Sequence, residues 1–294
     1  MLVDGSIARS TVARVIPSRP FLKWAGAKTR LVAAIRATAP PQTRRLIEPF
    51  AGSGAVALNL GFERNLLADT NADLIEIYRE LKRSGEQFIA TCEKFFTPRH
   101  NTAKTYYALR TQFNASTDHR HKAALFVYLN RHGYNGLCRY NARGGYNVPF
   151  GRYDAPYFPR KEMENFRRLL ARCTLRRADF RSILAAAGDG DFVYCDPPYV
   201  PASATANFTA YARGGFGSHD QANLLAACLA ATRRGACVAI SNHDTPETRR
   251  LYAEADEIIS LSVARHISRN GRKRTRAKEL LVVYRPSGPA GLSA

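Results

Sequence analysis

One pattern narrows the possible folds of this chain more than any other: from Arg45 onward, short buried strands alternate with helices. "RLIEPF" (45–50) predicts a strand, followed by a glycine-rich turn and an apolar helix from Val56 to Leu60. "RNLLADTN" (64–71) predicts a second strand, and residues 72–82 a second helix. Because strands linked through helices by short connections run parallel, the pattern predicts a parallel α/β sheet.

The same alternation returns in the second half of the chain, where turn residues separate the segments. The predicted elements are an amphipathic helix at 160–172 ("RKEMENFRRLLAR"), strands at 174–180 ("TLRRADF") and 191–196 ("DFVYCD"), a helix from His219 to Arg234, a strand at 236–242 ("ACVAISN"), a helix from Pro246, a strand from Glu257 and a closing strand at 278–286 ("KELLVVYRP").

The segment between these two halves differs in character. It is aromatic, helical at first and then rich in glycine and asparagine, and it has no acidic residue between Asp118 and Asp154. We therefore predict an α/β domain interrupted by a separate, mostly helical insert. The expected boundaries are a flexible extension at 1–19, the α/β domain at 20–80 and 158–294, and the insert at 81–157.

The charge of the chain limits its partners. There are 44 Lys and Arg residues against 24 Asp and Glu residues, a formal net charge of +20. Such an excess favours a polyanionic partner, most simply nucleic acid, although a basic surface that only aids solubility is the alternative. The six cysteines are scattered without metal-site spacing, which predicts reduced, buried thiols and no metal. No apolar run is long enough to span a membrane.

The stretch "EPFAGSGAV" (48–56) is the first that carries chemistry. Gly52 and Gly54 follow a strand end and let the backbone approach a ligand at a helix N-terminus. Asp69 ends the next strand, where a carboxylate can accept hydrogen bonds from ribose hydroxyls. The stretch lacks the third glycine of the dinucleotide fingerprint and the G-K-[ST] of a P-loop. The pattern indicates a nucleoside cofactor, and a purely structural tight turn is the alternative.

The stretch "YCDPPY" (194–199) is the second one whose residues suggest a chemical role. Asp196 is an acceptor when ionised, while Pro197 and Pro198 hold the backbone extended so that its carbonyls face outward. Tyr199 offers a flat face on which a base can stack. The combination suits a planar ring that carries an exocyclic amino group, whereas an ordinary turn after a strand is the alternative.

Long motifs in a fixed order give the sequence a family resemblance. "PFLKWAGAK" (20–28), "EPFAGSGAV" and "YCDPPY", together with the insert stretch "YLNRHGYNGLCRYNARGGYNVPFGRY" (128–153), "SATANFTAY" (203–211) and "ISNHDT" (240–245), resemble the Dam-type DNA adenine-N6 methyltransferases of the D12 class, α group. The resemblance covers roughly residues 20–285. Ala27 departs from it, because the family usually has a second glycine there.

The resemblance implies a Rossmann-like methyltransferase sheet with a target-recognition insert, and S-adenosylmethionine as cofactor. It implies that the cofactor is bound by Trp24 and Lys28 at the methionine end, Asp69 at the ribose, Asp179 and Phe180 at the adenine, and Gly52, Gly54 and Asp196 around them. Phe180 as an ordinary core residue is the alternative.

The resemblance also implies the reaction. N6 of adenine is a poor nucleophile, and hydrogen bonds from N6 to Asp196 and to the Pro197 carbonyl localise its lone pair. The target base must leave the duplex, and Tyr199 is expected to stack on it. The amine then attacks the methyl group directly. Cys195 lacks the Pro-Cys setting of a cytosine-C5 enzyme and is expected to be buried.

The insert is expected to read DNA, with GATC as the site that close family members recognise. The resemblance implies that Lys23 and Arg139 contact guanine and that Leu137 and Pro149 contact the thymine methyl group. It implies that Tyr134 wedges into the base stack and that Asn135 fills the space left by the flipped adenine. It implies backbone or flanking contacts by Asn141, Arg152 and Ser203. A basic run at 265–278 predicts phosphate contacts from a hairpin loop, with a solvated loop as the alternative.

Two other functions remain open at this point. A methyltransferase acting on RNA or on cytosine N4 would share the D-P-P-Y stretch, and a binding-only protein would occupy GATC without chemistry. The dense match of the insert argues against the first, and the complete set of cofactor residues against the second. We expect a monomer that acts on double-stranded DNA in the cytoplasm, at the nucleoid, with roles in DNA replication and mismatch repair implied by the resemblance.

Overall fold

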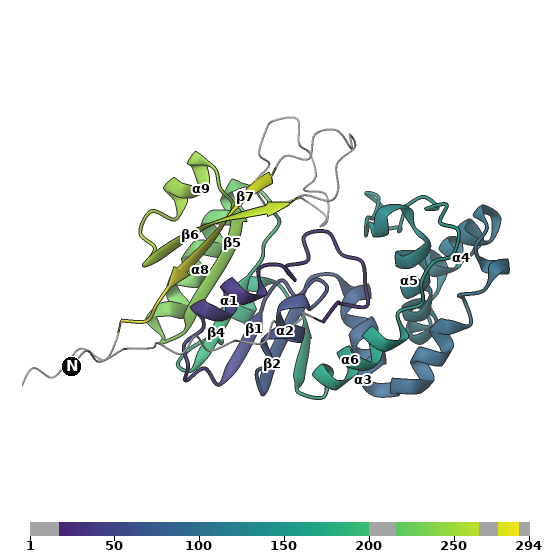
Figure 1. Ribbon diagram of the computed structural model, residues 1–294, viewed down its shortest axis with the longest axis horizontal. Helices are drawn as coiled ribbons and strands as arrows, with labels where there is room; N and C mark the ends of the chain where they lie inside the picture. Colours follow the sequence, from purple (N-terminus) through teal and green to yellow (C-terminus); the bar gives the residue numbers. More distant parts are fainter. Residues whose placement is uncertain (1–17, 200–215, 265–275, 288–294) are drawn as a thin grey trace, which may run out of the picture.

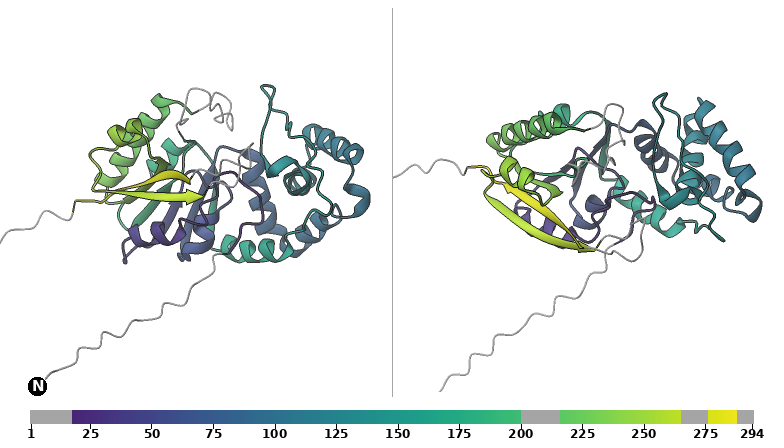
Figure 2. Two further views of the ribbon diagram at one scale, coloured as in Figure 1. Left: turned by 45° about the horizontal axis from the view of Figure 1, so that its top comes forward. Right: turned by 90° about the horizontal axis from the view of Figure 1, so that it is seen from above.

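The computed structural model describes residues 18–199, 216–264 and 276–287, and it contains a seven-stranded sheet with helices on both faces (Figures 1 and 2). The order of the strands is β3-β2-β1-β4-β5-β7-β6. β7 is antiparallel to both of its neighbours and the other pairs are parallel. The strands are β1 (Arg45–Glu48), β2 (Arg64–Asp69), β3 (Cys173–Arg177), β4 (Asp191–Cys195), β5 (Cys237–His243), β6 (Glu257–Ala264) and β7 (Arg276–Tyr284). The predicted fold class is confirmed.

Helices cover both faces of the sheet because its central strands are apolar on both sides. Phe192 and Tyr194 of β4 face one buried cluster, whereas Val193 and Cys195 of the same strand face a second. The helices are α1 (Val32–Thr38), α2 (Ala55–Leu60), α3 (Ala72–Glu93), α4 (Ala103–Ala115), α5 (His119–His132), α6 (Arg160–Leu170), α7 (Phe180–Leu184), α8 (Ser218–Arg233) and α9 (Pro246–Leu251), with short 3-10 turns at Pro98–His100 and Tyr134–Gly136.

Two predicted elements have different bounds in the structure. The strand predicted at 174–180 ends at Arg177, because the Asp179 side chain accepts a hydrogen bond from the Arg181 amide and caps α7. The helix predicted at 72–82 continues to Glu93 past a non-helical Gly85 (φ 47°). The expected domain boundary at residue 81 therefore lies inside α3, which runs from the sheet toward the insert (Figure 1).

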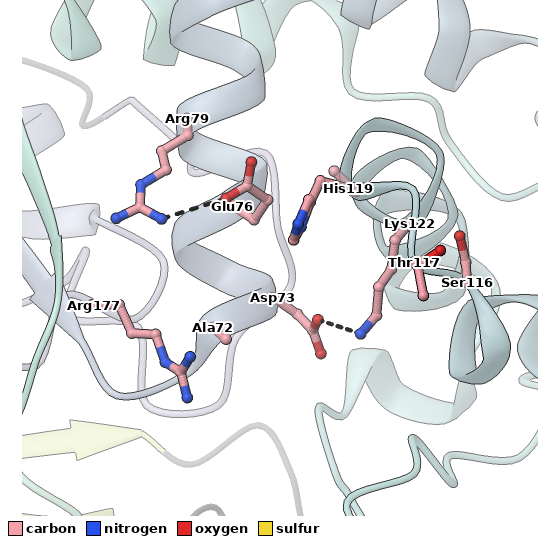
Figure 3. A pocket seen from close by; sticks show the side chains of 10 residues that line it. Ala72, Asp73, Glu76, Arg79, Ser116, Thr117, His119, Lys122 and Arg177 are labelled. Carbon is pink, nitrogen blue, oxygen red and sulfur yellow. Dashed lines mark hydrogen bonds and ion pairs between the residues drawn. The ribbon is translucent and has the colours of Figure 1, made fainter.

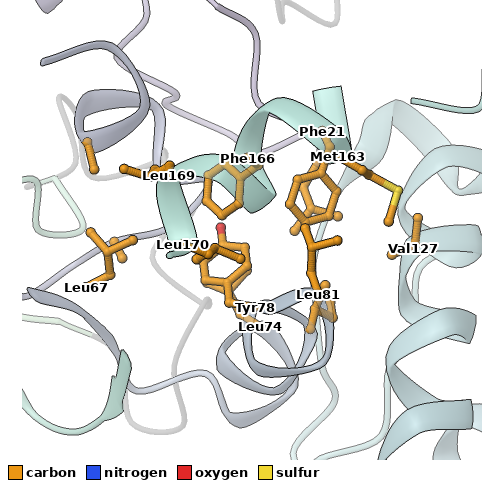
Figure 4. Close-up of a cluster of buried hydrophobic side chains, with 14 of the residues drawn as sticks. Phe21, Leu67, Leu74, Tyr78, Leu81, Val127, Met163, Phe166, Leu169 and Leu170 are labelled. Atoms are coloured by element: carbon orange, nitrogen blue, oxygen red, sulfur yellow. The ribbon is translucent and has the colours of Figure 1, made fainter. Parts of the chain in front are cut away.

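One aromatic cluster joins the sheet domain to the insert. The ring of Phe21 lies 5.2 Å from that of Phe166 on α6, which lies 4.8 Å from that of Tyr78 on α3. Met163 and Val127, the latter on α5, complete this side of the cluster (Figure 4). The buried Phe21 fixes the start of the segment that carries Trp24 and Lys28. Ser18, at the end of the expected flexible extension, exchanges two hydrogen bonds with Asn59.

Candidate active site

Three carboxyl groups lie at the carboxyl ends of adjacent parallel strands. Glu48 ends β1, Asp69 ends β2, and Asp196 follows β4 directly. The chain order of the sheet reverses between β1 and β4. Open α/β sheets bind their ligands outside the strand ends at such a switch point. The topology therefore brings the predicted residues Asp69 and Asp196, together with Glu48, to the position where a ligand is expected.

The glycine-rich turn after β1 needs glycine for two distinct reasons. Gly52 and Gly54 both have positive φ, 47° and 66°, which side chains disfavour. A Cβ on Gly52 would lie 2.9 Å from the Trp24 indole nitrogen, and a Cβ on Gly54 would lie 2.6 Å from the Phe166 ring. Gly52 therefore permits close approach to a predicted cofactor residue, whereas Gly54 permits packing against the core.

Asp69 holds the turn in place. Its carboxylate accepts hydrogen bonds from the Gly52 amide at 3.0 Å and from the Asn71 amide at 2.9 Å. Burial raises the pKa of the Asp69 carboxyl, and these backbone hydrogen bonds oppose the rise. The side chain predicted to bind ribose is thus fixed by two backbone donors at the edge of the sheet.

Asp179 and Phe180 lie beyond the end of β3. Asp179 is exposed and forms an ion pair with Arg181 at 3.2 Å. Phe180 is 3% exposed and stacks on Phe50 with the ring centres 5.6 Å apart, so it packs in the core. Phe50 belongs to the segment after β1, which links this ring pair to the glycine-rich turn.

Asp196 and Lys28 form the closest charged pair of the site. The Lys28 ammonium lies 2.8 Å from the Asp196 carboxylate and also donates to the Gly26 carbonyl at 2.7 Å. The lysine side chain is 7% exposed and that of the aspartate 22% exposed. Burial raises the pKa of the Asp196 carboxyl, while the Lys28 charge lowers it in part. Lys28, predicted beside the methionine carboxylate, thus pairs with the predicted catalytic acceptor.

The proline carbonyls and Tyr199 complete this end of β4. The Pro198 carbonyl accepts a hydrogen bond from the Gln221 side chain, whereas no donor to the Pro197 carbonyl is found among the described residues. The Tyr199 hydroxyl donates to Glu279 of β7 at 3.0 Å. The Lys28 ammonium lies 4.7 Å from the centre of the Tyr199 ring. Asp196 and the Pro197 carbonyl are therefore two acceptors on successive residues, with the Tyr199 ring two residues further along the chain.

Sequence reasoning missed the roles of two acids at this edge. Glu48 is buried and accepts a hydrogen bond from the Ala57 amide at 2.7 Å. Burial raises the pKa of Glu48 to about 8, so its carboxyl group is largely protonated at neutral pH. Its place at the end of a buried strand was the available signal. Glu279, which orients Tyr199, comes from a distant strand and gave no signal in the sequence.

The insert brings several predicted DNA-contact residues together. Asn130 on α5 exchanges hydrogen bonds with the backbone of Lys23 at 2.8 and 2.7 Å. The Lys23 ammonium lies 4.2 Å from the centre of the Tyr153 ring, and the Tyr153 hydroxyl accepts a hydrogen bond from the Asn135 amide. Tyr134, which precedes Asn135 in the chain, is 49% exposed, so its ring is accessible to a partner. Burial lowers the pKa of Lys23, with the Arg131 charge adding to the effect.

The predicted guanine reader Arg139 is held by a residue that sequence reasoning did not identify. Its Nε donates to the Asn147 side chain at 2.8 Å, and its Nη2 donates to the Asn147 carbonyl at 3.3 Å. Arg139 is exposed and lies on an irregular segment closed by the bridge between Tyr140 and Tyr146. The structure thus fixes one edge of the guanidinium and leaves the other toward solvent.

The other predicted contact residues lie on the same irregular segment. Asn141 accepts hydrogen bonds from the amides of Arg143 and Gly145 and so shapes a turn. Pro149 is exposed, Leu137 is half-buried, and Arg152 is exposed with a positive φ of 55°. Ser203 and residues 265–275 of the basic run lie outside the described residues.

The comparisons with known proteins agree with this geometry. Residues 24–267 match the D12 class N6 adenine-specific DNA methyltransferase family. The chain is 48% identical over 269 residues to the DNA adenine methylase of Vibrio cholerae serotype O1, with 91% of this chain and 96% of the relative covered. It is 45% identical to the DNA adenine methylase of Escherichia coli strain K12 (92% and 96% covered) and 46% identical to that of Serratia marcescens (91% and 99% covered).

The chain belongs to the D12 class N6 adenine-specific DNA methyltransferase family. It is an adenine-specific DNA methyltransferase, and the predictions of family, fold and reaction class are confirmed. In the part of the chain that the structure describes, no helix is long and apolar enough to cross a membrane. The same residues contain no group of three or more acidic, histidine or cysteine side chains that could hold a metal.

Proposed function

We propose that this protein methylates N6 of adenine in GATC sites of double-stranded DNA, with S-adenosylmethionine as the methyl donor. The single observation that carries the proposal is the pair of acceptors after β4. The Asp196 carboxylate and the Pro197 carbonyl, for which the described residues offer no donor, belong to successive residues at the switch point of the sheet, and Tyr199 follows two residues later. Two acceptors match the two hydrogens of an exocyclic amino group.

The residues at the neighbouring strand ends fit the cofactor. Asp69 offers carboxylate oxygens to ribose hydroxyls, and Gly52 lets Trp24 approach the turn closely. Asp179 and Phe180 stand past β3, on the side expected for the adenine of the cofactor. S-adenosylmethionine, when bound, supplies an electrophilic methyl group. Lys28 can then bind the methionine carboxylate only by sharing or leaving Asp196, because the two side chains are paired without it.

The catalytic residues act on the amine and not on the phosphate backbone. Hydrogen bonds to Asp196 and to the Pro197 carbonyl pull electron density from the N6 hydrogens and localise the nitrogen lone pair. Tyr199, whose hydroxyl is anchored by Glu279, presents its face to the flipped base. Alignment of amine and methyl group supplies much of the acceleration, and no covalent enzyme intermediate is required.

The insert supplies the choice of sequence. A guanidinium that is already oriented loses little conformational entropy on pairing with guanine O6 and N7, which favours Arg139 as a reader. Lys23 is proposed to contact the other guanine, and Leu137 and Pro149 the thymine methyl. Tyr134 and Asn135 lie next to each other on an exposed turn suited to wedging and gap filling. Asn141, Arg152 and Ser203 are proposed to contact the backbone.

A digestion experiment tests the GATC proposal. Plasmid DNA is incubated with the protein and S-adenosylmethionine and then cut with restriction endonucleases that recognise GATC but differ in their sensitivity to adenine methylation. We expect protection from the sensitive enzyme and cleavage by the enzyme that needs the methyl group. Methyl incorporation into DNA without a change in either digestion would show that the enzyme modifies a different site. We further propose that the protein acts as a monomer on cytoplasmic, nucleoid DNA.

A further inference from the structure

One carboxylate connects the sheet domain to two parts of the insert. Asp73, in the first turn of α3, accepts a hydrogen bond from the Tyr140 hydroxyl at 2.7 Å. Its other oxygen lies 2.9 Å from the Lys122 ammonium on α5 (Figure 3). The Asp73 side chain is 18% exposed, and Figure 3 shows it pointing across the gap between α3 and α5. Both contacts run to the insert from the start of α3, the helix that follows the strand ending in Asp69.

The turn between Asp69 and Asp73 is itself held by the predicted ribose carboxylate. Asp69 accepts a hydrogen bond from the Asn71 amide, and the Asn71 side chain accepts one from the Leu74 amide, which caps α3. The Asn71 side chain also lies 3.6 Å from the Cys138 sulfur and donates toward it. A ligand that engages the Asp69 oxygens therefore competes for an atom that positions this turn.

These contacts lead to Arg139, the predicted guanine reader. Cys138 and Tyr140 are the two neighbours of Arg139 in the chain, and both contact the turn that follows Asp69. The rest of the irregular segment is anchored inside the insert, where Asn114 exchanges hydrogen bonds with the Tyr146 backbone. The backbone on both sides of Arg139 is thus tied to the cofactor edge of the sheet.

We propose that Asp73 and Tyr140 are positioning residues that couple occupation of the cofactor site to the placement of Arg139. The inference rests on the proposed function, since it takes Asp69 as a cofactor residue and Arg139 as a base reader. A bound cofactor fixes the turn after Asp69, and the fixed turn holds Tyr140 and the backbone beside Arg139. Because coupling between two binding sites is reciprocal, the cognate duplex must tighten cofactor binding by the same factor.

Tyr140→Phe isolates this link. It removes the hydroxyl that Asp73 accepts from and keeps the ring, which packs edge-on against Tyr146 at 5.7 Å. Tyr157→Phe is the matched control, because it also removes a tyrosine–carboxylate hydrogen bond, here to Glu162 at 2.9 Å, at a place that does not link the two sites. Asp73→Asn is a second test, since it removes the charge that pairs with Lys122.

The measurement is calorimetric binding of S-adenosylhomocysteine, which cannot react, to each full-length protein. Each titration is made alone, with a duplex that contains one GATC site, and with a scrambled duplex. We expect the GATC duplex to tighten binding in the unaltered protein and in Tyr157→Phe. In Tyr140→Phe and in Asp73→Asn this tightening should fall roughly tenfold or more, the loss expected for one hydrogen bond to a charged group, with affinity in the absence of DNA unchanged.

Three results would separate the possible failures. Equal tightening in Tyr140→Phe and in the unaltered protein overturns the inference and leaves the proposed function intact. Absence of any tightening in an unaltered protein that still methylates GATC overturns it as well. An unaltered protein that binds neither S-adenosylhomocysteine nor the duplex refutes the proposed function, and the inference falls with it.

Discussion

Replacing Gly54 with alanine should destabilise the protein more than the same replacement at Gly61. The two glycines flank α2 and have nearly the same left-handed backbone, with φ and ψ of 66° and 24° at Gly54 and of 70° and 28° at Gly61. The conformational cost of a side chain should therefore be equal at both positions, about 1–2 kcal/mol.

Packing makes the difference between them. A Cβ on Gly54 would lie 2.6 and 2.7 Å from two ring carbons of Phe166, whereas the nearest atom to a Cβ on Gly61 is the flexible tip of Arg36 at 3.9 Å. Phe166 is fully buried between Phe21 and Tyr78 and cannot swing aside. Overpacking of such a site adds about 1–3 kcal/mol. The expected loss of unfolding free energy is thus about 2–5 kcal/mol for Gly54→Ala against about 1–2 kcal/mol for Gly61→Ala.

Urea unfolding followed by circular dichroism gives both values by linear extrapolation. A double variant, Gly54→Ala with Phe166→Leu, should lose less stability than the sum of its single changes, because the smaller side chain relieves the clash. Equal losses at Gly54 and Gly61, or strict additivity in the double variant, would refute the reasoning that Gly54 is required for packing.

Three further predictions concern charge and recognition. Lys28→Met should move the acid limb of the kcat/KM–pH profile to higher pH while Lys28→Arg should not, because burial raises the pKa of Asp196 and the cation opposes the rise; an unmoved limb contradicts the pairing. Burial lowers the pKa of His132 to about 4 from 6.5, so the unfolded chain binds a proton that the fold excludes. This histidine should therefore contribute a fall of roughly 3 kcal/mol in unfolding free energy from pH 6.5 to 4, and urea titrations across that range should show a weaker pH dependence in His132→Gln than in the unaltered protein. Arg139→Ala should raise methylation of sites that differ from GATC at one guanine relative to GATC, by on the order of 1–3 kcal/mol of lost discrimination; unchanged relative rates would exclude Arg139 as the reader.

Strand ends were the most predictable part of the site. A buried run followed by an acid, as at Asp69 and Asp196, fixes both the strand and the direction in which its carboxyl end points. The periodicity of α6 was equally clear from the sequence, because this helix buries one face. In such elements the local pattern and the tertiary packing favour the same structure.

Element boundaries and pairings between distant residues were less predictable. The helix predicted at 72–82 ends close to the kink at Gly85, but a second helical stretch follows it up to Glu93, and α3 as a whole packs on α5 and α6. The pairing of Lys28 with Asp196 and the anchoring of Tyr199 by Glu279 join residues that are far apart in the chain. Such pairings depend on the completed sheet, and no local pattern encodes them.

The role of Asp196 in catalysis can be tested by identifying the methylated nucleosides in the product. Duplex DNA is incubated with cofactor and protein, hydrolysed, and assayed by mass spectrometry for each methylated base, with duplex affinity measured in parallel. We expect N6-methyladenine as the methylated base with the unaltered protein. We expect its yield to fall at least about 100-fold with Asp196→Ala at near-normal duplex affinity. Asp189→Ala, which removes an exposed carboxylate paired with Arg44, should behave as the unaltered protein. N4-methylcytosine in the product, or near-normal turnover by Asp196→Ala, would contradict the account.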